Sequence, residues 1–350
     1  MIYCGDFVFP FDNAEPLDLP NDFLSKEKIV NFESLIIDDF SKYPKVATGV
    51  ALNSSPTSIV RLKQLSTIGV SLANNHIQDF DISINEQRSL FSNESIQPFG
   101  AGDNIDVASE GIKYTSNNVD FYALSFGWDV IKCPYATRKN RGVNPMVYEH
   151  IIELVERAKI EHSDRKIVVI FHANYEFELY PQPGHRKLYF ELIDIGVDAV
   201  FCHHTHIVGG YEIYKGRPIF YSLGNFYLPD YEYSGFKLIS PSFTNLGLCV
   251  EYNGIVDEIL LHWVENKNNK LVYIGNENLH ESKKMKALSE FSGMSHQDYI
   301  NWFRVNRAKK KLLPIYKNPD SKVESYFNGE LVNYRQKVID LFVRLGLKKY

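Results

Sequence analysis

Cysteine is scarce in this chain of 350 residues and is spread widely along it. The four cysteines are Cys4, Cys133, Cys202 and Cys249, and three of them stand in apolar, strand-like runs. Small secreted domains that depend on disulfides carry cysteines at a much higher density. We therefore expect four buried free thiols in a reducing compartment.

Long apolar runs are missing as well. No segment approaches the roughly 20 apolar residues that a transmembrane helix needs. Residues 1–6, MIYCGD, have neither the basic region nor the apolar region of a secretory signal, and they are typical of a first strand. These absences predict a cytoplasmic protein without a transmembrane segment.

Neither sign of charge dominates the chain. The 38 Lys and Arg residues against 43 Asp and Glu residues give a net charge of -5, which is small for this length. We therefore expect no nucleic-acid partner, and any anionic ligand must be captured by a local site. The hydrophobic content of 44% is sufficient for a core, and the length allows two domains or one domain with an extension.

What the chain does contain is one unit that occurs three times: a helical stripe of apolar residues, a turn, a short strand, and then histidine. We expect the first of the three helices to begin at Ser58 and stop at Gly69, and the third to stop at Gly196. In an α/β sheet, ligands bind in the crevice beyond the carboxyl ends of the strands, so the histidines should meet there. The strands and the histidines that follow them are 70–73 with His76, 167–171 with His172, and 197–202 with His203, His204 and His206.

Carboxylate and amide side chains follow other short strands at the same point. Asp6 and Glu33 end two apolar runs near the amino terminus, and Asn225 follows the strand 218–221. Carboxylate oxygens and imidazole nitrogens together are the ligands of hydrolytic metal sites. The candidate metal ligands are Asp6, Glu33, Asn75, His172, His204 and His206.

The spacing of His204 and His206 carries a further expectation. Two residues that are separated by one position point to the same side only in an extended segment, and His203 would then face away as a structural or supporting residue. Beyond residue 241 we expect an antiparallel hairpin over 246–265, a further strand over 271–274, and helices from Ser282 onward. The basic run Lys309-Lys310-Lys311 is typical of a solvated helix face.

The motifs taken in order resemble one known family, the bacterial capsule synthesis proteins of the CapA, or poly-γ-glutamate capsule (PGA_cap), type. This family is a branch of the calcineurin-like metallophosphoesterase superfamily. The resemblance runs from residue 1 to about residue 230. It rests on Gly5-Asp6, Asn31-Phe32-Glu33, the segment 71–76 with Asp79, Gly100-Ala101-Gly102, His172 with Glu176, the segment 193–198, the histidine cluster and the segment 221–226.

This resemblance implies an α/β fold, a four-layer αββα metallophosphoesterase sandwich over residues 1–280, with a mostly helical extension over 281–350 packed on or beside it. It implies one or two divalent metal ions (manganese, zinc, iron or magnesium) on the six ligands named above. It assigns leaving-group protonation or transition-state stabilisation to His76. Asp79 and Glu176 are further catalytic candidates, although each could instead orient a histidine or cap a loop. Supporting or substrate-contacting roles fall on Asn31, Asn74, His203 and Asn225.

The chain also departs from the family pattern. Ala173-Asn174 replaces a usual Trp-Gly, which affects the expected substrate pocket and leaves the ligands intact. Val8 stands where many superfamily members carry a histidine, so one metal could be held less tightly or the site could use a single ion.

The resulting prediction is a metal-dependent, phosphoesterase-like hydrolase associated with capsule or surface-polymer synthesis. Two alternatives stay open: a non-hydrolytic accessory protein that binds metal and a polyanion such as poly-γ-glutamate, and an amide or peptide hydrolase with the same site. The expected partner is an anionic small-molecule or polymer substrate, and a capsule-synthesis complex could recruit the chain. Arg138 and Arg141 could contact such a substrate, but a solvated loop is the preferred interpretation.

Overall fold

The structure is a computed structural model that describes residues 1–14, 17–47, 49–308 and 313–344. The predicted mixed α/β class is confirmed, because helices alternate with strands that form two large sheets and several short strand pairs. The four cysteines are free and buried, as expected. The predicted basic face of Lys309-Lys310-Lys311 lies outside the described residues.

The first large sheet is mixed and has eight strands. Its amino-terminal strands run parallel to one another, whereas its last three strands form an antiparallel meander that contains the predicted hairpin. In order across the sheet the strands are β20 (Lys270–Asn278), β19 (Leu260–Lys267), β18 (Leu246–Glu251), β1 (Ile2–Phe7), β2 (Lys28–Phe32), β5 (Thr67–Ser71) and β6 (Gln97–Phe99), and β15 (Asn225–Tyr227) pairs with β1.

The second large sheet has six strands. Its central strands are parallel, and an antiparallel strand closes each edge. In order the strands are β13 (Tyr211–Tyr214), β14 (Arg217–Phe220), β12 (Ala199–His203), β11 (Lys166–His172), β9 (Val119–Gly127) and β8 (Ile112–Ser116).

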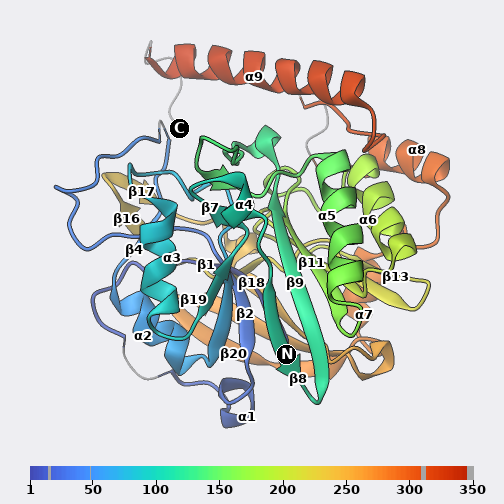
Figure 1. The fold of residues 1–350 in the computed structure, drawn as a ribbon, viewed down its shortest axis with the longest axis horizontal. Helices are drawn as coiled ribbons and strands as arrows, with labels where there is room; N and C mark the ends of the chain where they lie inside the picture. The colour runs from blue at the N-terminus through green and yellow to red at the C-terminus, as the bar shows by residue number, and fades with distance from the viewer. Residues whose placement is uncertain (15–16, 48, 309–312, 345–350) are drawn as a thin grey trace.

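Apolar side chains from both sheets form one shared cluster, in which the rings of Tyr3 and Phe201 stack with centroids 4.1 Å apart. The other face of the first sheet packs with α2 (Thr57–Gln64) and α3 (Ile84–Ser92), and the other face of the second with α5 (Tyr148–Glu161) and α6 (Pro183–Ile195). These helix pairs lie on opposite sides of the molecule (Figure 1). Burial of apolar area on both faces of each sheet is the main stabilising contribution.

The boundaries of the predicted helices are right in one case and wrong in another. Gly196 ends α6 in the left-handed conformation, with a φ of +114°, as predicted. The first helix instead begins after Pro56 and ends at Leu65, because the φ of proline already suits a first turn. Gly69 lies inside β5, where a Cβ atom would come within 2.7 Å of the side chain of Ile112.

Helices dominate after Ser282, as the sequence predicted. Tyr299 and Phe303 of α8 are fully buried in the cluster beneath α5 and α6, whereas Leu331 and Tyr334 of α9 are exposed. The division at residue 280 stays a prediction. The remaining helices and strands are α1 (Asn21–Leu24), α4 (Ile105–Ala108), α7 (Lys283–Leu288), α8 (His296–Asn306), α9 (Lys322–Arg344), β3 (Leu35–Ile36), β4 (Asn53–Ser54), β7 (Ala101–Gly102), β10 (Gly142–Val143), β16 (Tyr231–Tyr233) and β17 (Phe236–Leu238), with 3-10 turns at Asp129–Ile131, Ser242–Thr244 and Val256–Glu258.

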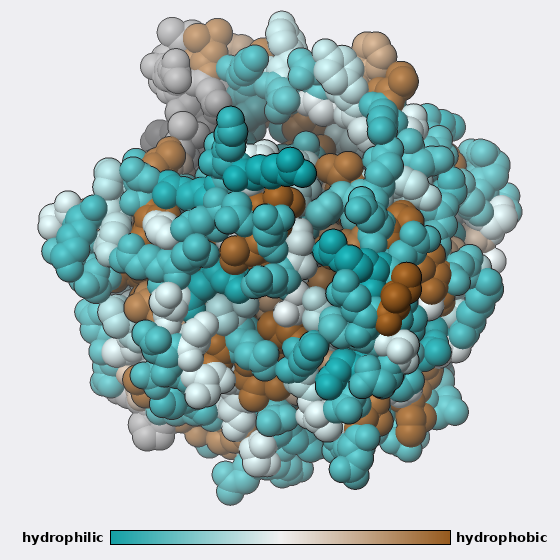
Figure 2. All heavy atoms as spheres, in the orientation of Figure 1, coloured by the Kyte–Doolittle hydropathy of each residue, from teal (hydrophilic) through white to brown (hydrophobic). Residues whose placement is uncertain are grey.

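The surface is polar over the face that Figure 2 shows, where apolar side chains form only small separate patches. Across the described ranges, no helix combines the length and the apolar content needed to span a membrane. The cytoplasmic location stays a prediction from the sequence.

A buried ion pair joins α6 to β13 of the second sheet, and hydrogen bonds extend it to the segment before α8. The guanidinium of Arg186 donates two hydrogen bonds to the Glu212 carboxylate, at 2.6 and 2.8 Å, and a third to the carbonyl of Met294 at 3.0 Å. Glu212 also accepts hydrogen bonds from the Tyr221 hydroxyl and from the amide of Gly293. The carboxylate and the guanidinium therefore have partners on every side, as a buried pair requires.

We expect Glu212→Gln to lower the free energy of unfolding by about 3–5 kcal/mol, because it leaves the buried Arg186 guanidinium without its counter-charge. Chemical denaturation followed by circular dichroism measures this change. The control is Lys215→Gln, which removes an exposed ion pair with Asp194 and should cost less than about 1 kcal/mol. Equal losses in the two variants would contradict the stabilising role of the buried pair.

Candidate functional site

The predicted ligands come together where strand ends of the two large sheets meet. Asp6 lies on β1, and Glu33 directly follows β2. Both strands belong to the first sheet. His172 is the last residue of β11 in the second sheet, and the amide nitrogen of Asn31 lies 3.2 Å from its Nδ1 atom. This contact places the ends of both sheets within hydrogen-bonding distance of each other.

One group of candidate ligands contains Glu33, His172 and His204, whose ligand atoms lie within 4.8 Å of one another. All three side chains are buried. Asn75 extends this group, because its Oδ1 atom lies 2.7 Å from Nε2 of His172. An ion about 2.0–2.2 Å from each ligand spans separations of up to ~4.4 Å, so small adjustments would close this group around an ion.

A second group contains Asp6, Glu33 and His206, again with ligand atoms within 4.8 Å of one another. His206 Nδ1 lies 3.3 Å from an Asp6 oxygen and 3.8 Å from a Glu33 oxygen. Asn225 Oδ1 accepts a hydrogen bond from the same ring nitrogen, at 2.9 Å. Glu33 is common to both groups, so the arrangement offers two ion positions with one shared carboxylate.

The Glu33 carboxylate fits a cation. It is fully buried, and neither of its oxygens accepts a hydrogen bond from any residue that the structure describes. A buried carboxylate without hydrogen-bond donors is costly unless a positive charge compensates it. The surrounding donors are imidazole nitrogen and carboxylate oxygen, which suit divalent transition metals and zinc. The residues present therefore fit the metal that the sequence predicted.

Two further residues surround the ligands. Asn31 donates to Asp6 Oδ1 at 2.7 Å, which fixes the carboxylate. Asn74 donates to the carbonyl of Phe32 and accepts from the amide of His76, and so holds the loop after β5 against the end of β2. Such contacts orient ligands in metal sites. The roles themselves stay predictions.

The conformation of the histidine cluster differs from the prediction. His204 and His206 both have positive φ angles, +89° and +58°, so the segment is a tight turn and not extended. The turn still brings the two rings close, with centroids 5.8 Å apart. His203 does not face away: it ends β12, and its Nδ1 atom lies 3.6 Å from Asp6. A left-handed turn can gather all three rings because its residues no longer alternate between two sides.

Glycine is required beside Asp6. A Cβ atom on Gly5 would lie 1.9 Å from the carbonyl oxygen of Gly224, which itself accepts a hydrogen bond from the Asp6 amide. The pairing of β1 with β15 shifts register between Asp6 and Phe7, and the Asp6 carboxylate lies 3.3 Å from Nδ1 of His206. The two glycines of the Gly5-Asp6 and Gly224-Asn225 motifs thus allow the segment that carries the ligand Asp6 to touch the segment that carries Asn225.

The electrostatics of the site keep several ligands in their metal-binding forms. Burial would raise the pKa of Asp6, but the neighbouring His206, His203 and His172 outweigh it and hold that pKa below its usual range. Burial and the neighbouring imidazoles lower the pKa of His204, so its ring is neutral at pH 7. For His206, burial is outweighed by the Glu33 and Asp6 carboxylates, which raise its pKa to about 10. A cation at this position would replace that proton as the compensating charge.

His76 and Asp79 form a pair at the edge of the site. Nδ1 of His76 and Oδ2 of Asp79 are 2.6 Å apart, and the same carboxylate oxygen accepts from the amide of Leu52 at 2.7 Å. Burial would lower the pKa of His76, but Asp79 outweighs it and the pKa is raised. A partly exposed imidazole that is held by a carboxylate has the arrangement of a proton donor.

Glu176 is not brought into the site by a direct contact. It is exposed in the loop after β11, and no hydrogen bond or ion pair joins it to another described residue. Its charge does act on His206 from a distance. The neighbouring Asn174 stabilises this loop, because it forms hydrogen bonds with Tyr180 and Gln182.

Val8, which stands in place of a superfamily histidine, is buried in a small apolar cluster.

An open pocket of about 610 Å³ lies beside the His76–Asp79 turn. Gln78 and Lys139 contribute to its lining, and the sequence analysis singled out neither of them. The only local signal was the density of cations around Arg138 and Arg141, which does not reveal which of them faces a cavity.

Comparison with known proteins gives a consistent family. Residues 11–230 match the family described as Bacterial capsule synthesis protein PGA_cap. The PGA biosynthesis protein CapA of Bacillus subtilis (strain 168) is 30% identical over 225 residues, which are 63% of this chain and 57% of that protein. The Capsule biosynthesis protein CapA of Bacillus anthracis is 26% identical over 228 residues, which are 64% of this chain and 54% of that protein.

A third relative comes from Mycobacterium tuberculosis (strain H37Rv) and is named "Probable polyglutamine synthesis accessory protein". It is 26% identical over 193 residues, which are 52% of this chain and 50% of that protein. This chain therefore spans little more than half the length of the Bacillus relatives. Because the family match covers well over half of the sequence, the chain belongs to the bacterial capsule synthesis protein PGA_cap family.

Proposed function

We propose that this PGA_cap protein is a metal-dependent hydrolase of the phosphoesterase type that acts in capsule or surface-polymer synthesis. The observation that carries the proposal is the buried Glu33 carboxylate, which lacks hydrogen-bond donors and is shared by two groups of ligand atoms. Two sheets that pack face to face, with helices outside, support the four-layer αββα sandwich of the metallophosphoesterases. Membership of the family supplies the capsule setting.

The proposal assigns each ligand to one of two ion positions. His172, His204 and Asn75 would hold the first ion, Asp6 and His206 the second, and Glu33 would bridge both. Manganese, iron and zinc suit this mixture of donors, and magnesium suits it more loosely. When bound, such ions lower the pKa of a water nucleophile and neutralise charge on the substrate.

The surrounding side chains would position the reacting groups. Asn31 fixes the Asp6 carboxylate, so this ligand needs little reorganisation during the reaction. Asn225 contacts the same His206 nitrogen that faces Asp6 and Glu33, so it would release this hydrogen bond when the ring binds an ion. His76 would protonate the leaving oxygen, and the Asp79 carboxylate favours the protonated form of its ring and orients it. Glu176 is the weakest of the three catalytic candidates because it makes no direct contact in the site.

A second function has its own support. The M. tuberculosis relative is named as an accessory protein of polymer synthesis, so this chain could bind metal and a polyanion without cleaving it. The same ligands would then hold the metal for recognition of the polyanion. Turnover of a phosphoester distinguishes the hydrolase from the accessory protein that only binds. Turnover of an amide substrate would identify the remaining alternative, amide or peptide hydrolysis.

We expect His204→Ala and His172→Ala each to weaken binding of Mn²⁺ or Zn²⁺ by at least about tenfold, because each removes a ligand of the first ion position. Isothermal titration calorimetry on metal-stripped protein, with metal content checked by mass spectrometry, measures the loss. The matched control is His280→Ala, which removes an exposed histidine at the surface beside Asp257. If all three variants bind metal as tightly as the unmodified chain, the assigned ligands are wrong.

We expect His76→Ala to keep its metal and to lose roughly 10²–10⁴-fold in kcat on a chromogenic phosphodiester, because the leaving oxygen loses its proton donor. The assay uses chain reconstituted separately with manganese, zinc and magnesium, and His280→Ala is again the control. Turnover that is unchanged in His76→Ala would contradict the role of this histidine. Metal binding without turnover on any ester would favour the accessory function.

A further inference from the structure

We propose that the open pocket beside the His76–Asp79 turn is a subsite for an anionic group of the substrate, a carboxylate or a phosphate. This inference rests on the proposed function, since it places a second contact for the molecule that the metal site would bind. It adds a binding site at Lys139 and Arg141 that neither the family match nor the ligand set assigns.

The pocket is adjacent to the metal site through two separate segments. The first is the turn 76–81, which presents His76 to the metal ligands and Gln78 to the pocket. The second begins at Cys133, where burial and, more weakly, the charge of Glu33 raise the pKa of the thiol, and continues to Pro134 in the pocket wall. The turn and the segment after Cys133 therefore connect the surroundings of the metal site to the wall of this pocket along the chain.

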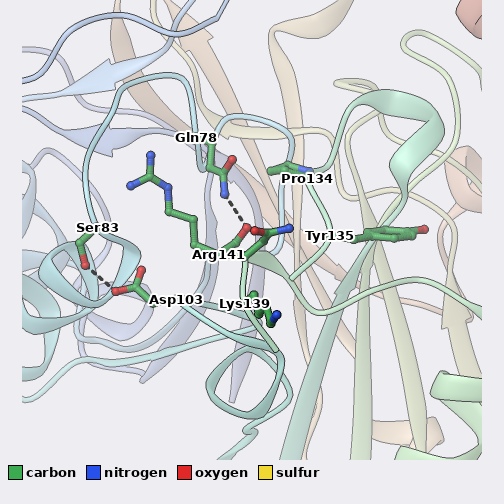
Figure 3. Close-up of a pocket in the computed structure, with 8 residues that line it drawn as sticks. Gln78, Ser83, Asp103, Pro134, Tyr135, Lys139 and Arg141 are labelled. Carbon is green, nitrogen blue, oxygen red and sulfur yellow. Dashed lines mark hydrogen bonds between the residues drawn. The ribbon is translucent and has the colours of Figure 1, made fainter. Parts of the chain in front are cut away.

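The wall of the pocket is built from fixed contacts. Gln78 donates from its amide to the carbonyl of Arg141 at 2.7 Å, and the guanidinium of Arg141 pairs with Asp81. Figure 3 shows the Arg141 side chain crossing between Gln78 and the Ser83–Asp103 pair, while the ring of Tyr135 points away from it. The loop thus holds Arg141 in place without help from a ligand, which lowers the cost of ordering this part of the wall on binding.

Asp103 lines the pocket, and both it and the nearby Asp81 already have partners. Asp103 accepts from the Ser83 hydroxyl at 2.7 Å and from the amide of Ile84 at 2.8 Å, so it stabilises the start of α3. Asp81 is paired with Arg141. Lys139 is exposed at the pocket, and no described acidic side chain lies within ion-pair distance of it. The Lys139 ammonium therefore stays available for an anionic group of a ligand.

The shape and polarity of the pocket fit a flexible anionic chain. It is open and has a volume of about 610 Å³, which exceeds the space that a single small anion needs. Side chains with cationic or amide groups, Lys139, Arg141, Asn140 and Gln78, form much of its lining, so an apolar ligand would leave polar groups without partners. A linear substrate could place one charged group here while another segment lies at the metal ligands.

Calorimetric titration of the metal-loaded full chain tests this subsite with three probes: penta-γ-glutamate, a linear tetraphosphate, and uncharged pentaglutamine. Lys139→Gln should weaken binding of at least one anionic probe about tenfold, because one charge-assisted contact is lost. Arg138→Gln is the matched control: it removes the same charge from an exposed neighbour that does not line the pocket, and it should change little. Pentaglutamine should not respond to either variant.

The anionic probe whose affinity falls in Lys139→Gln identifies the ligand group: penta-γ-glutamate indicates a carboxylate, and tetraphosphate indicates a phosphate. Equal affinities in Lys139→Gln and Arg138→Gln, or no binding of either anionic probe, would overturn the subsite. The test is independent of catalysis, because the titration measures binding of the probes and not turnover, and Lys139→Gln should leave the metal content unchanged. If the unmodified chain hydrolyses nothing but Lys139→Gln still weakens binding, the subsite stands and the hydrolase proposal fails.

Discussion

One buried carboxylate imposes the main physical constraint on this structure. Glu33 is removed from water, lacks hydrogen-bond donors among the described residues, and lies against His172 and His206. An isolated charge in such surroundings would be strongly destabilising, so its neighbours must supply or attract positive charge. In the chain itself that role falls partly on His206, whose pKa is raised to about 10 against the effect of burial. Divalent cations at the same place would compensate the charges of the Glu33 and Asp6 carboxylates together.

The fold explains how such a cluster can form from distant segments. Parallel strands in both sheets end at the same place, so a carboxylate from β1, one from the end of β2 and histidines from β11 and β12 converge. Close approach of Gly5 to the Gly224 carbonyl allows β15 to join β1 and to deliver Asn225 to His206. Outside this rigid cluster, the turn that carries His76 leads to a cationic pocket, so the proposed reaction centre and the proposed anion subsite share one short segment.

The sequence was sufficient to predict the fold class, the helices that precede each histidine, and the residues that assemble around Glu33, because periodicity and position after a strand are local signals. It failed where tertiary contacts decide. The turn at His204 and His206 has left-handed residues that no spacing rule predicted, and Gly69 is explained by the crowding of Ile112 and not by a helix end. No local pattern identified Lys139 and Gln78 as pocket residues, since a pocket between separate loops exists only after folding.

The most direct test of the account is the number of metal ions bound per chain, measured by mass spectrometry after reconstitution and gel filtration, in the unmodified protein and in Glu33→Gln. The amide has nearly the same shape as the carboxylate but no charge, and it would weaken both proposed ion positions because Glu33 belongs to both groups. The account predicts two ions in the unmodified chain and the loss of both from Glu33→Gln. Retention of the full metal content by a folded Glu33→Gln variant would contradict it.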